Sequence, residues 1–333
     1  MSTNKDTIAA RGLDVGTSRI CLAVPDANSF EYQTQLNAFV TIPYSKMTES
    51  SLVKASIPHT TRGNEIVVHG NESERFADLL NVETRRTMTR GVLNPLESES
   101  LSMLRQILAC LLGKAEAGSK LCFTVPAAPL GSEDSLTYHE ATLKQVLSDF
   151  GYDVKSINEG LAVIYSELET SNYTGIGISC GGGLCNVCMA YLSVPVLSFS
   201  VPKAGDYIDQ SASSVTGERA NRIRMIKEET FHLNGAFADK TFQVLGVYYD
   251  EMIQSLVQGM KQAFASAQTK PKIGRPIPLV LSGGTALPQG FRDRFEKILK
   301  ESDFPIALSE VRMAAEPLHT SARGALVAAM TEM

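Results

Sequence analysis

The sequence lacks any segment typical of a membrane span or a secretion signal. No apolar run approaches the roughly 20 residues that a transmembrane helix needs. Residues 1–7 are polar and have neither the apolar core of a signal peptide nor the pattern of an amphipathic surface anchor. We therefore expect a cytoplasmic protein with no membrane anchor.

Positive charge and metal-ligand patterns are also scarce. The net charge is −5, so nucleic acid is not expected as a direct partner. A local basic group, Arg85, Arg86 and Arg90, is predicted to be a solvated face. The five histidines are dispersed, without metal-ligand spacing. The six cysteines lie in apolar segments, which indicates reduced thiols.

The stretch Gly12–Arg19 predicts two strands joined by a tight turn. Gly16 allows the backbone to turn sharply and to approach a ligand closely. Successive amides in such a turn form a concavity for anions. Asp14, at the end of the first strand, is placed to hold a divalent cation through water, and Thr17 and Ser18 add hydroxyl groups. Alone, the same pattern is equally typical of an ordinary hairpin.

The same pattern returns in the second half of the chain. Gly175–Ser179 reads as a strand, Cys180–Gly183 as a glycine turn, Leu184–Leu192 as the return strand and Val196–Val201 as a third strand. This indicates an internal duplication of a βββαβα unit. Two lobes that each offer a glycine hairpin can grip one phosphate chain between them.

The segments between the hairpins alternate between strands and helices. Leu121–Pro126 is predicted to be a buried strand, 135–150 a helix, Tyr152–Ile157 a strand, and Glu159 the start of another helix. A strand at Leu279–Ser282 follows a long helix over 239–267, and a final helix is expected over 321–330. Such alternation implies a covered, largely parallel sheet and an α/β fold.

The region after the first hairpin looks like a small insert. Ala38–Pro43 is taken as the third strand of the first unit, and the polar, Ser-rich segment Ser45–Pro58 as a loop. Asn71 is expected to cap a short helix. Asn94–Pro95 is expected to open a long amphipathic helix.

These motifs, in this order, resemble those of the actin-like ATPases, the superfamily of actin, the seventy-kilodalton heat-shock chaperones and the sugar kinases. Gly12–Ser18 resembles the first phosphate loop and Cys180–Gly183 the second. Phe123–Ala127 resembles the strand before the connecting helix, and Ile157–Ala162 the connecting segment. Arg224–Glu228 resembles the helix at the ribose and adenine, and Leu281–Ala286 the adenosine loop. The compact length is similar to that of bacterial actins such as MreB and MamK.

The resemblance implies a two-lobed, actin-like α/β fold with a duplicated core, a nucleotide cleft and small insert subdomains. Domain I is expected to comprise residues 1–150 and 305–333, with an insert over about 31–94. Domain II is expected over 151–304, with an insert over about 205–275.

The resemblance also implies a binding site for ATP or ADP with Mg²⁺. Asp14 is expected to hold the magnesium ion through water, and Glu159 to orient or deprotonate the attacking water. The expected nucleotide-binding residues are Gly16, Thr17, Ser18, Arg19, Gly181, Gly182, Gly183, Lys227, Glu228, Gly283, Gly284 and Thr285.

Several of these residues have a plainer interpretation. The Asn158–Glu159 pair is also what a helix N-terminus favours. Arg19 suits an outward-facing strand position, and Lys227 with Glu228 suits an exposed helix pair. Cys180, Cys185 and Cys188 have part of the spacing of an iron–sulfur run, but cysteines beside a strand hairpin also serve as small apolar residues.

Two departures from the family pattern affect the expected activity. Ser179 stands where the family has an Asp, and Leu184 where it has a Thr. Because a serine supplies no charge to the magnesium environment, hydrolysis is expected to be slow and an Asp at 179 to speed it. The expected function is a bacterial or archaeal actin-like protein that forms nucleotide-dependent filaments of itself. The alternatives are a monomeric chaperone or reactivase-type ATPase, a small-molecule kinase, and a nucleotide-binding scaffold without turnover.

Overall fold

The structure is a computed structural model that describes residues 9–27, 29–131, 136–266, 275–331 and 333. Residues 1–7 and the end of the second predicted insert, at 267–274, lie outside the described residues. No helix in the described ranges is long and apolar enough to cross a membrane.

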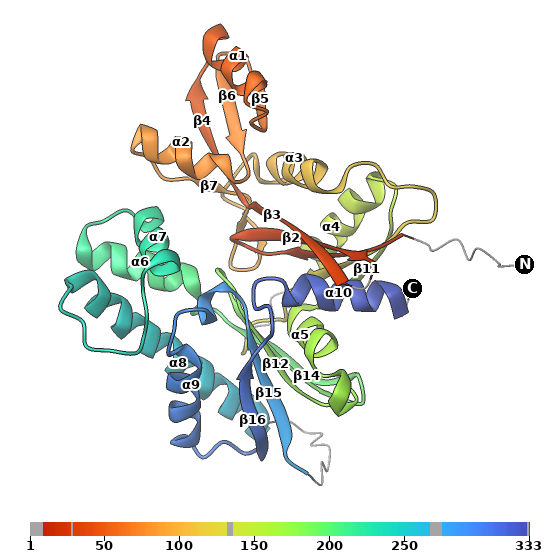
Figure 1. The fold of residues 1–333 in the computed structure, drawn as a ribbon, viewed down its shortest axis with the longest axis vertical. Coiled ribbons are helices and arrows are strands. Elements are labelled where there is room, and N and C mark those ends of the chain that lie inside the picture. Colours follow the sequence, from red (N-terminus) through yellow and green to blue (C-terminus); the bar gives the residue numbers. More distant parts are fainter. Residues whose placement is uncertain (1–8, 28, 132–135, 267–274, 332) are drawn as a thin grey trace, which may run out of the picture.

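Two five-stranded mixed sheets form the frame of the molecule (Figure 1). The first has the order β11-β10-β1-β2-β3 and the second β14-β13-β12-β15-β16. The strands of the first are β1 (Ala10–Val15), β2 (Arg19–Asp26), β3 (Ser29–Leu36), β10 (Lys120–Val125) and β11 (Asp153–Asn158). Those of the second are β12 (Gly175–Cys180), β13 (Cys185–Tyr191), β14 (Val194–Val201), β15 (Ile277–Ser282) and β16 (Leu308–Met313).

The two sheets repeat one topology. In each, three strands run antiparallel through two hairpins, and two further strands pair parallel beside the first of them. The predicted duplication and the α/β fold class are therefore confirmed.

Helices cover both faces of each sheet (Figure 1). Two lie between the sheets and share a buried apolar cluster with both: α5 (Glu159–Glu167) and α10 (Thr320–Thr331). The outer face of the first sheet packs against α3 (Ser100–Leu112) and α4 (Thr137–Asp149). The second sheet packs against α8 (Lys240–Ser266) and α9 (Phe291–Lys300), while α6 (Gly205–Thr216) packs on α8 and α7 (Ala220–Glu229) packs on α6.

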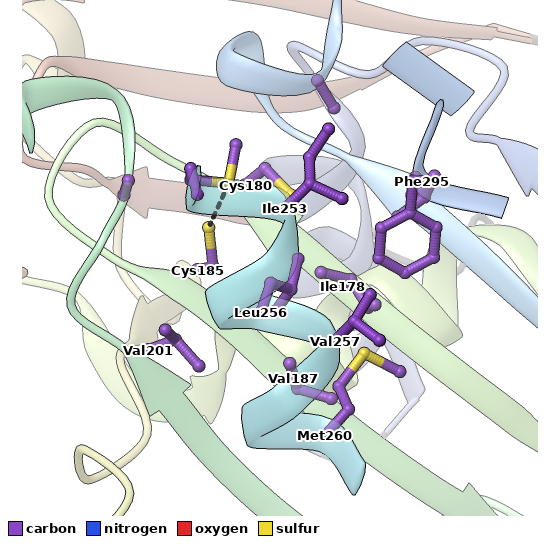
Figure 2. Packing of buried hydrophobic residues seen from close by; sticks show 14 of the residues in the cluster. Ile178, Cys180, Cys185, Val187, Val201, Ile253, Leu256, Val257, Met260 and Phe295 are labelled. Atoms are coloured by element: carbon purple, nitrogen blue, oxygen red, sulfur yellow. Dashed lines mark hydrogen bonds between the residues drawn. The ribbon is translucent and has the colours of Figure 1, made fainter. Parts of the chain in front are cut away.

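Figure 2 shows how α8 fills the core of the second half. Its residues Ile253, Leu256, Val257 and Met260 pack against strand residues such as Ile178. The regular helical spacing of these apolar residues explains why the long helix could be predicted from sequence.

The insert of the first half is a small sheet with helices, and it differs from the prediction in two places. Its strand order is β5-β6-β4-β7. The elements are β4 (Ala38–Pro43), α1 (Lys46–Lys54), β5 (His59–Arg62), β6 (Glu65–His69), α2 (Glu72–Leu80) and β7 (Arg85–Arg86), followed by the hairpin of β8 (Met88–Thr89) and β9 (Val92–Leu93).

The predicted loop at Ser45–Pro58 is wrong, because most of it is α1. Ser45 caps this helix by accepting a hydrogen bond from the Thr48 amide, and Leu52 is its buried residue. The third strand of the first unit is β3 rather than Ala38–Pro43, which belongs to the insert. As an edge strand with an alternating half-exposed pattern, β3 has no apolar run to mark it.

Two helix starts also differ. The helix expected from Asn94–Pro95 begins at Ser100, after turns in which Leu96 is fully exposed. Asn71 precedes α2, but its side chain bonds to the Leu36 amide and the Thr34 carbonyl instead of capping the helix. The strand β16 and the helix α6 were not predicted. The predicted domain boundaries stay a prediction, although β16 pairs within the second sheet.

Candidate nucleotide cleft

The two glycine turns meet in one cleft between the sheets. The cleft is lined by every residue that the sequence predicted for the site: Asp14, Gly16, Thr17, Ser18, Arg19, Glu159, Gly181, Gly182, Gly183, Lys227, Glu228, Gly283, Gly284 and Thr285. The fold therefore brings together residues from five separate stretches of chain, while their individual roles remain predictions.

The glycine turns face each other at very short range. A Cβ atom on Gly183 would lie 2.5 Å from Thr17 Oγ1, and one on Gly182 would lie 3.1 Å from Ser18 Cβ. Within the described chain, no hydrogen bond engages the amides of Thr17, Ser18, Gly182 or Gly183. Free amides converging from two turns are the arrangement that binds the oxygens of an anion.

Gly283 packs closely against the backbone of the second glycine turn. Its φ of +92° is in the region that favours glycine, and a Cβ there would collide with the backbone of Cys180. The next turn residues continue into a 3₁₀ turn over Gly284–Ala286, and Thr285 donates a 2.8 Å hydrogen bond to the Gly181 carbonyl. The predicted adenosine loop thus packs directly on the second glycine turn.

A pair of carboxylates lies at the base of the cleft. Asp14 ends β1 and accepts a 2.5 Å hydrogen bond from the Thr124 hydroxyl. Burial raises the pKa of Asp14 to about 6. Burial, and then the charge of Asp14, raises the pKa of Glu159 to about 8. Two neighbouring buried carboxyl groups form an oxygen-rich site, which fits a hard divalent cation such as Mg²⁺.

Glu159 does not act as the cap of its helix. Asn158 caps α5, since its side chain accepts hydrogen bonds from the amides of Gly160 and Leu161 at 2.9 and 3.3 Å. The buried carboxylate of Glu159 instead accepts a 2.8 Å hydrogen bond from Asn186 Nδ2. The helix-cap interpretation of the Asn158–Glu159 pair is therefore confirmed for Asn158, with Glu159 in the first turn of α5, while the Glu159 carboxylate has its own contact with Asn186.

Arg19 and Glu228 are paired with each other across the cleft. Arg19 Nη2 lies 2.5 Å from Glu228 Oε2, and both side chains are partly exposed. Lys227 is buried, with Nζ 2.7 Å from Asp209 Oδ1, and it donates to the Gly205 carbonyl. Burial raises the pKa of Asp209, which the Lys227 charge opposes. The exposed-pair interpretation is wrong for Lys227.

Arg224 lines the cleft and begins the segment that resembles the ribose and adenine helix, but it was not among the expected binding residues. Its side chain is 3% exposed, and Nη2 donates to Glu74 on α2, in the first insert. Its Nε and Nη1 atoms are buried and have no hydrogen-bond partner within the described residues. Buried donors without partners are rare, so this side chain fits acceptor atoms of a ligand. The three- and four-residue spacing of Arg224, Lys227 and Glu228 was the available signal, because it puts them on one face of α7.

The predicted solvated basic face is also corrected. Arg86 Nη1 lies 2.7 Å from Asp206 Oδ1 on α6, so this pair joins the two halves beside the cleft. Arg85 bonds Glu97 and stacks over Phe39, with 4.6 Å from its guanidinium carbon to the ring centroid. Only Arg90 of the three is classed as exposed.

The cysteines serve as apolar residues. Cys180 and Cys185 are opposite each other in β12 and β13 and face the core at α8 (Figure 2). Cys188 lies on the other face of the sheet, against α5. Because the thiols point to opposite faces, they cannot ligate one iron–sulfur cluster. The described residues contain no group of three or more His, Cys, Asp or Glu arranged to hold a metal ion.

Comparison of the sequence with models of known protein families identifies the family of this chain. A family model described as Volactin matches residues 9–329. This chain belongs to the Volactin family. No curated protein matches it.

Solved structures place this Volactin-family chain in the actin-like fold. A structure of a "MamK double helical filament" is similar with a TM-score of 0.70 and 16% identity, covering 96% of this chain and 97% of that chain. A non-polymerising MamK mutant bound to AMPPNP has a TM-score of 0.58 and 16% identity, covering 97% of this chain and 99% of that chain. The predicted actin-like fold, with the layout of bacterial actins, is confirmed.

Proposed function

We propose that this chain binds ATP and ADP in the cleft, hydrolyses ATP slowly and assembles with copies of itself into filaments. The observation that carries the proposal is the pair of glycine turns, whose unbonded amides face each other beside Asp14 and Glu159. The likeness to a MamK filament and to a nucleotide-bound MamK mutant supports assembly and nucleotide binding.

In this proposal the amides of the two turns cradle the phosphates. Because these amides need no side-chain movement, binding exploits donors that are already in place. Arg224 offers two buried donor atoms, and Lys227 and Glu228 line the same wall of the cleft near the ribose. The Arg19–Glu228 pair spans the cleft, so an entering phosphate competes with Glu228 for Arg19.

Asp14 is the residue proposed to hold Mg²⁺ through water. The cation, when bound, would neutralise charge that develops on the phosphates. Glu159 is proposed to orient and deprotonate the attacking water. A buried carboxyl with a raised pKa is suited to proton transfer near neutral pH.

Self-assembly is the proposed cellular activity, in the cytoplasm, with no direct nucleic-acid partner. A sedimentation assay with ATP, ADP, AMPPNP or no nucleotide tests it. We expect pelleting and filaments by electron microscopy with ATP. A protein that stays monomeric with every nucleotide and at every concentration would contradict assembly and favour the chaperone-type or kinase alternatives.

Nucleotide binding is tested separately with a fluorescent ATP analogue. Asp14→Asn should weaken the magnesium-dependent part of the affinity by about tenfold, in line with the loss of one charged ligand. Asp26→Asn, on the exposed end of the neighbouring strand, is the matched control and should bind as wild type does. Equal affinities with and without Mg²⁺ for all three proteins would refute the role given to Asp14.

A further inference from the structure

The Glu159 carboxylate is held from the opposite strand by Asn186, whose orientation is unambiguous. Asn186 is 1% exposed and its Oδ1 accepts a 2.9 Å hydrogen bond from the Ala127 amide. Because a backbone amide only donates, the side-chain oxygen must face Ala127 and the Nδ2 group must face Glu159. The amide therefore presents a fixed N–H donor to Glu159 Oε2, at 2.8 Å.

A second donor lies directly beside the first. Ser179 and Asn186 are opposite each other in the β12–β13 pair, so their side chains emerge on one face of the hairpin. The Ser179 hydroxyl is also hydrogen-bonded to the Glu159 carboxylate, and the serine is 5% exposed. Both donors come from the strands that flank the second glycine turn.

We propose that Ser179 and Asn186 are positioning residues that together orient the Glu159 carboxylate toward the phosphate end of the cleft. This inference rests on the proposed ATP hydrolysis and names what sets the geometry of its base. It gives Ser179 a role of its own, because the serine supplies a hydroxyl donor to Glu159 beside the buried carboxyl groups of Asp14 and Glu159.

The hydrogen bond reverses the expectation that an Asp at position 179 speeds hydrolysis. An ionised Asp accepts hydrogen bonds but cannot donate one. Ser179→Asp would thus remove the hydroxyl donor to Glu159 and add a third carboxyl group beside two buried ones. We now expect this substitution to slow phosphate release, whereas Ser179→Thr, which keeps the hydroxyl, should preserve it.

Single-turnover phosphate release and nucleotide affinity test the proposal in the full chain. Asn186→Ala and Ser179→Ala should each slow release about ten- to hundredfold, as expected for loss of a hydrogen bond to a charged group, with affinity changed by less than about twofold. In a Glu159→Ala background neither substitution should slow release further, because the group that they position is gone. Release as fast as wild type in Asn186→Ala and Ser179→Ala would overturn the proposal, as would failure of Ser179→Thr to rescue.

A second measurement separates this inference from the proposed hydrolysis. The unfolding midpoint without nucleotide is measured for wild type, Asn186→Ala, Glu159→Ala and the double variant. If Asn186 holds Glu159, the effect of Asn186→Ala should differ clearly between the two backgrounds. If the stability effects of Asn186→Ala and Glu159→Ala are coupled but no turnover is measurable, the proposed hydrolysis is rejected while the contact stands. If the two stability effects are strictly additive, the positioning role is rejected whatever the turnover.

Discussion

The buried Glu159 carboxyl should make the ligand-free protein less stable as the pH rises. Its pKa is raised from 4.5 to about 8, first by burial and then by Asp14. Between these two values the native state keeps a proton that the unfolded chain releases, so the free energy of unfolding falls with increasing pH. A neutral isostere, Glu159→Gln, escapes this penalty.

The size of the effect follows from the two pKa values. At 1.36 kcal/mol for each pKa unit, ionisation linkage penalises the native state by about 3 kcal/mol at pH 7 and about 4 kcal/mol at pH 8. At pH 5 the penalty is below about 1 kcal/mol, because the pH is then only slightly above the unfolded-state pKa of 4.5. Glu159→Gln should therefore be more stable than wild type by these amounts, although it removes the proposed catalytic group.

Urea unfolding without nucleotide or metal, at pH 5, 7 and 8, provides the assay. Far-UV circular dichroism is the suitable probe, because the chain has no tryptophan. Glu31→Gln, on the exposed edge strand β3, is the matched control and should change the midpoint little. If Glu159→Gln is no more stable than wild type at pH 8, or if its advantage is the same at pH 5, the carboxyl is not destabilised by burial and the reasoning is wrong.

Three further outcomes are expected. Gly183→Ala should weaken nucleotide binding by about tenfold or more, because its Cβ would fill the gap between the glycine turns; unchanged affinity in a fluorescence titration would contradict this. Glu74→Ala should lower the free energy of unfolding by about 2 kcal/mol, since it strands a buried guanidinium, whereas Glu72→Ala, which breaks an exposed pair, should cost less than about 0.5 kcal/mol in the same urea titration. Replacing Leu192 by Asn and Ser193 by Gly should stabilise the β13–β14 hairpin by about 1 kcal/mol, because both residues have positive φ; a lowered thermal midpoint would refute that.

Local patterns were enough to predict the frame of this protein. Glycine turns bounded by apolar strands mark both phosphate-type hairpins, and helical spacing marks α8 and α10. The repetition of one pattern at Gly12 and Gly175 also predicted two sheets of the same topology. These features are visible because they depend on residues that are close in sequence.

Elements without an apolar signature were missed. The edge strand β3 alternates half-exposed polar residues, and α1 buries only Leu52, so neither stands out by periodicity. In both cases contacts with the rest of the fold, such as the pairing of β3 with β2, decide the structure.

The sequence by itself therefore determined the duplicated α/β frame and many, but not all, of the residues that line the cleft. Only the tertiary structure decided how they pair there: Arg19 with Glu228, Arg224 with Glu74, and Glu159 with Asn186. These partners are tens to hundreds of residues apart in the chain. The physical reason is that the charge state and orientation of a buried polar group depend on its spatial neighbours and its solvation, which only the packing of the two halves specifies.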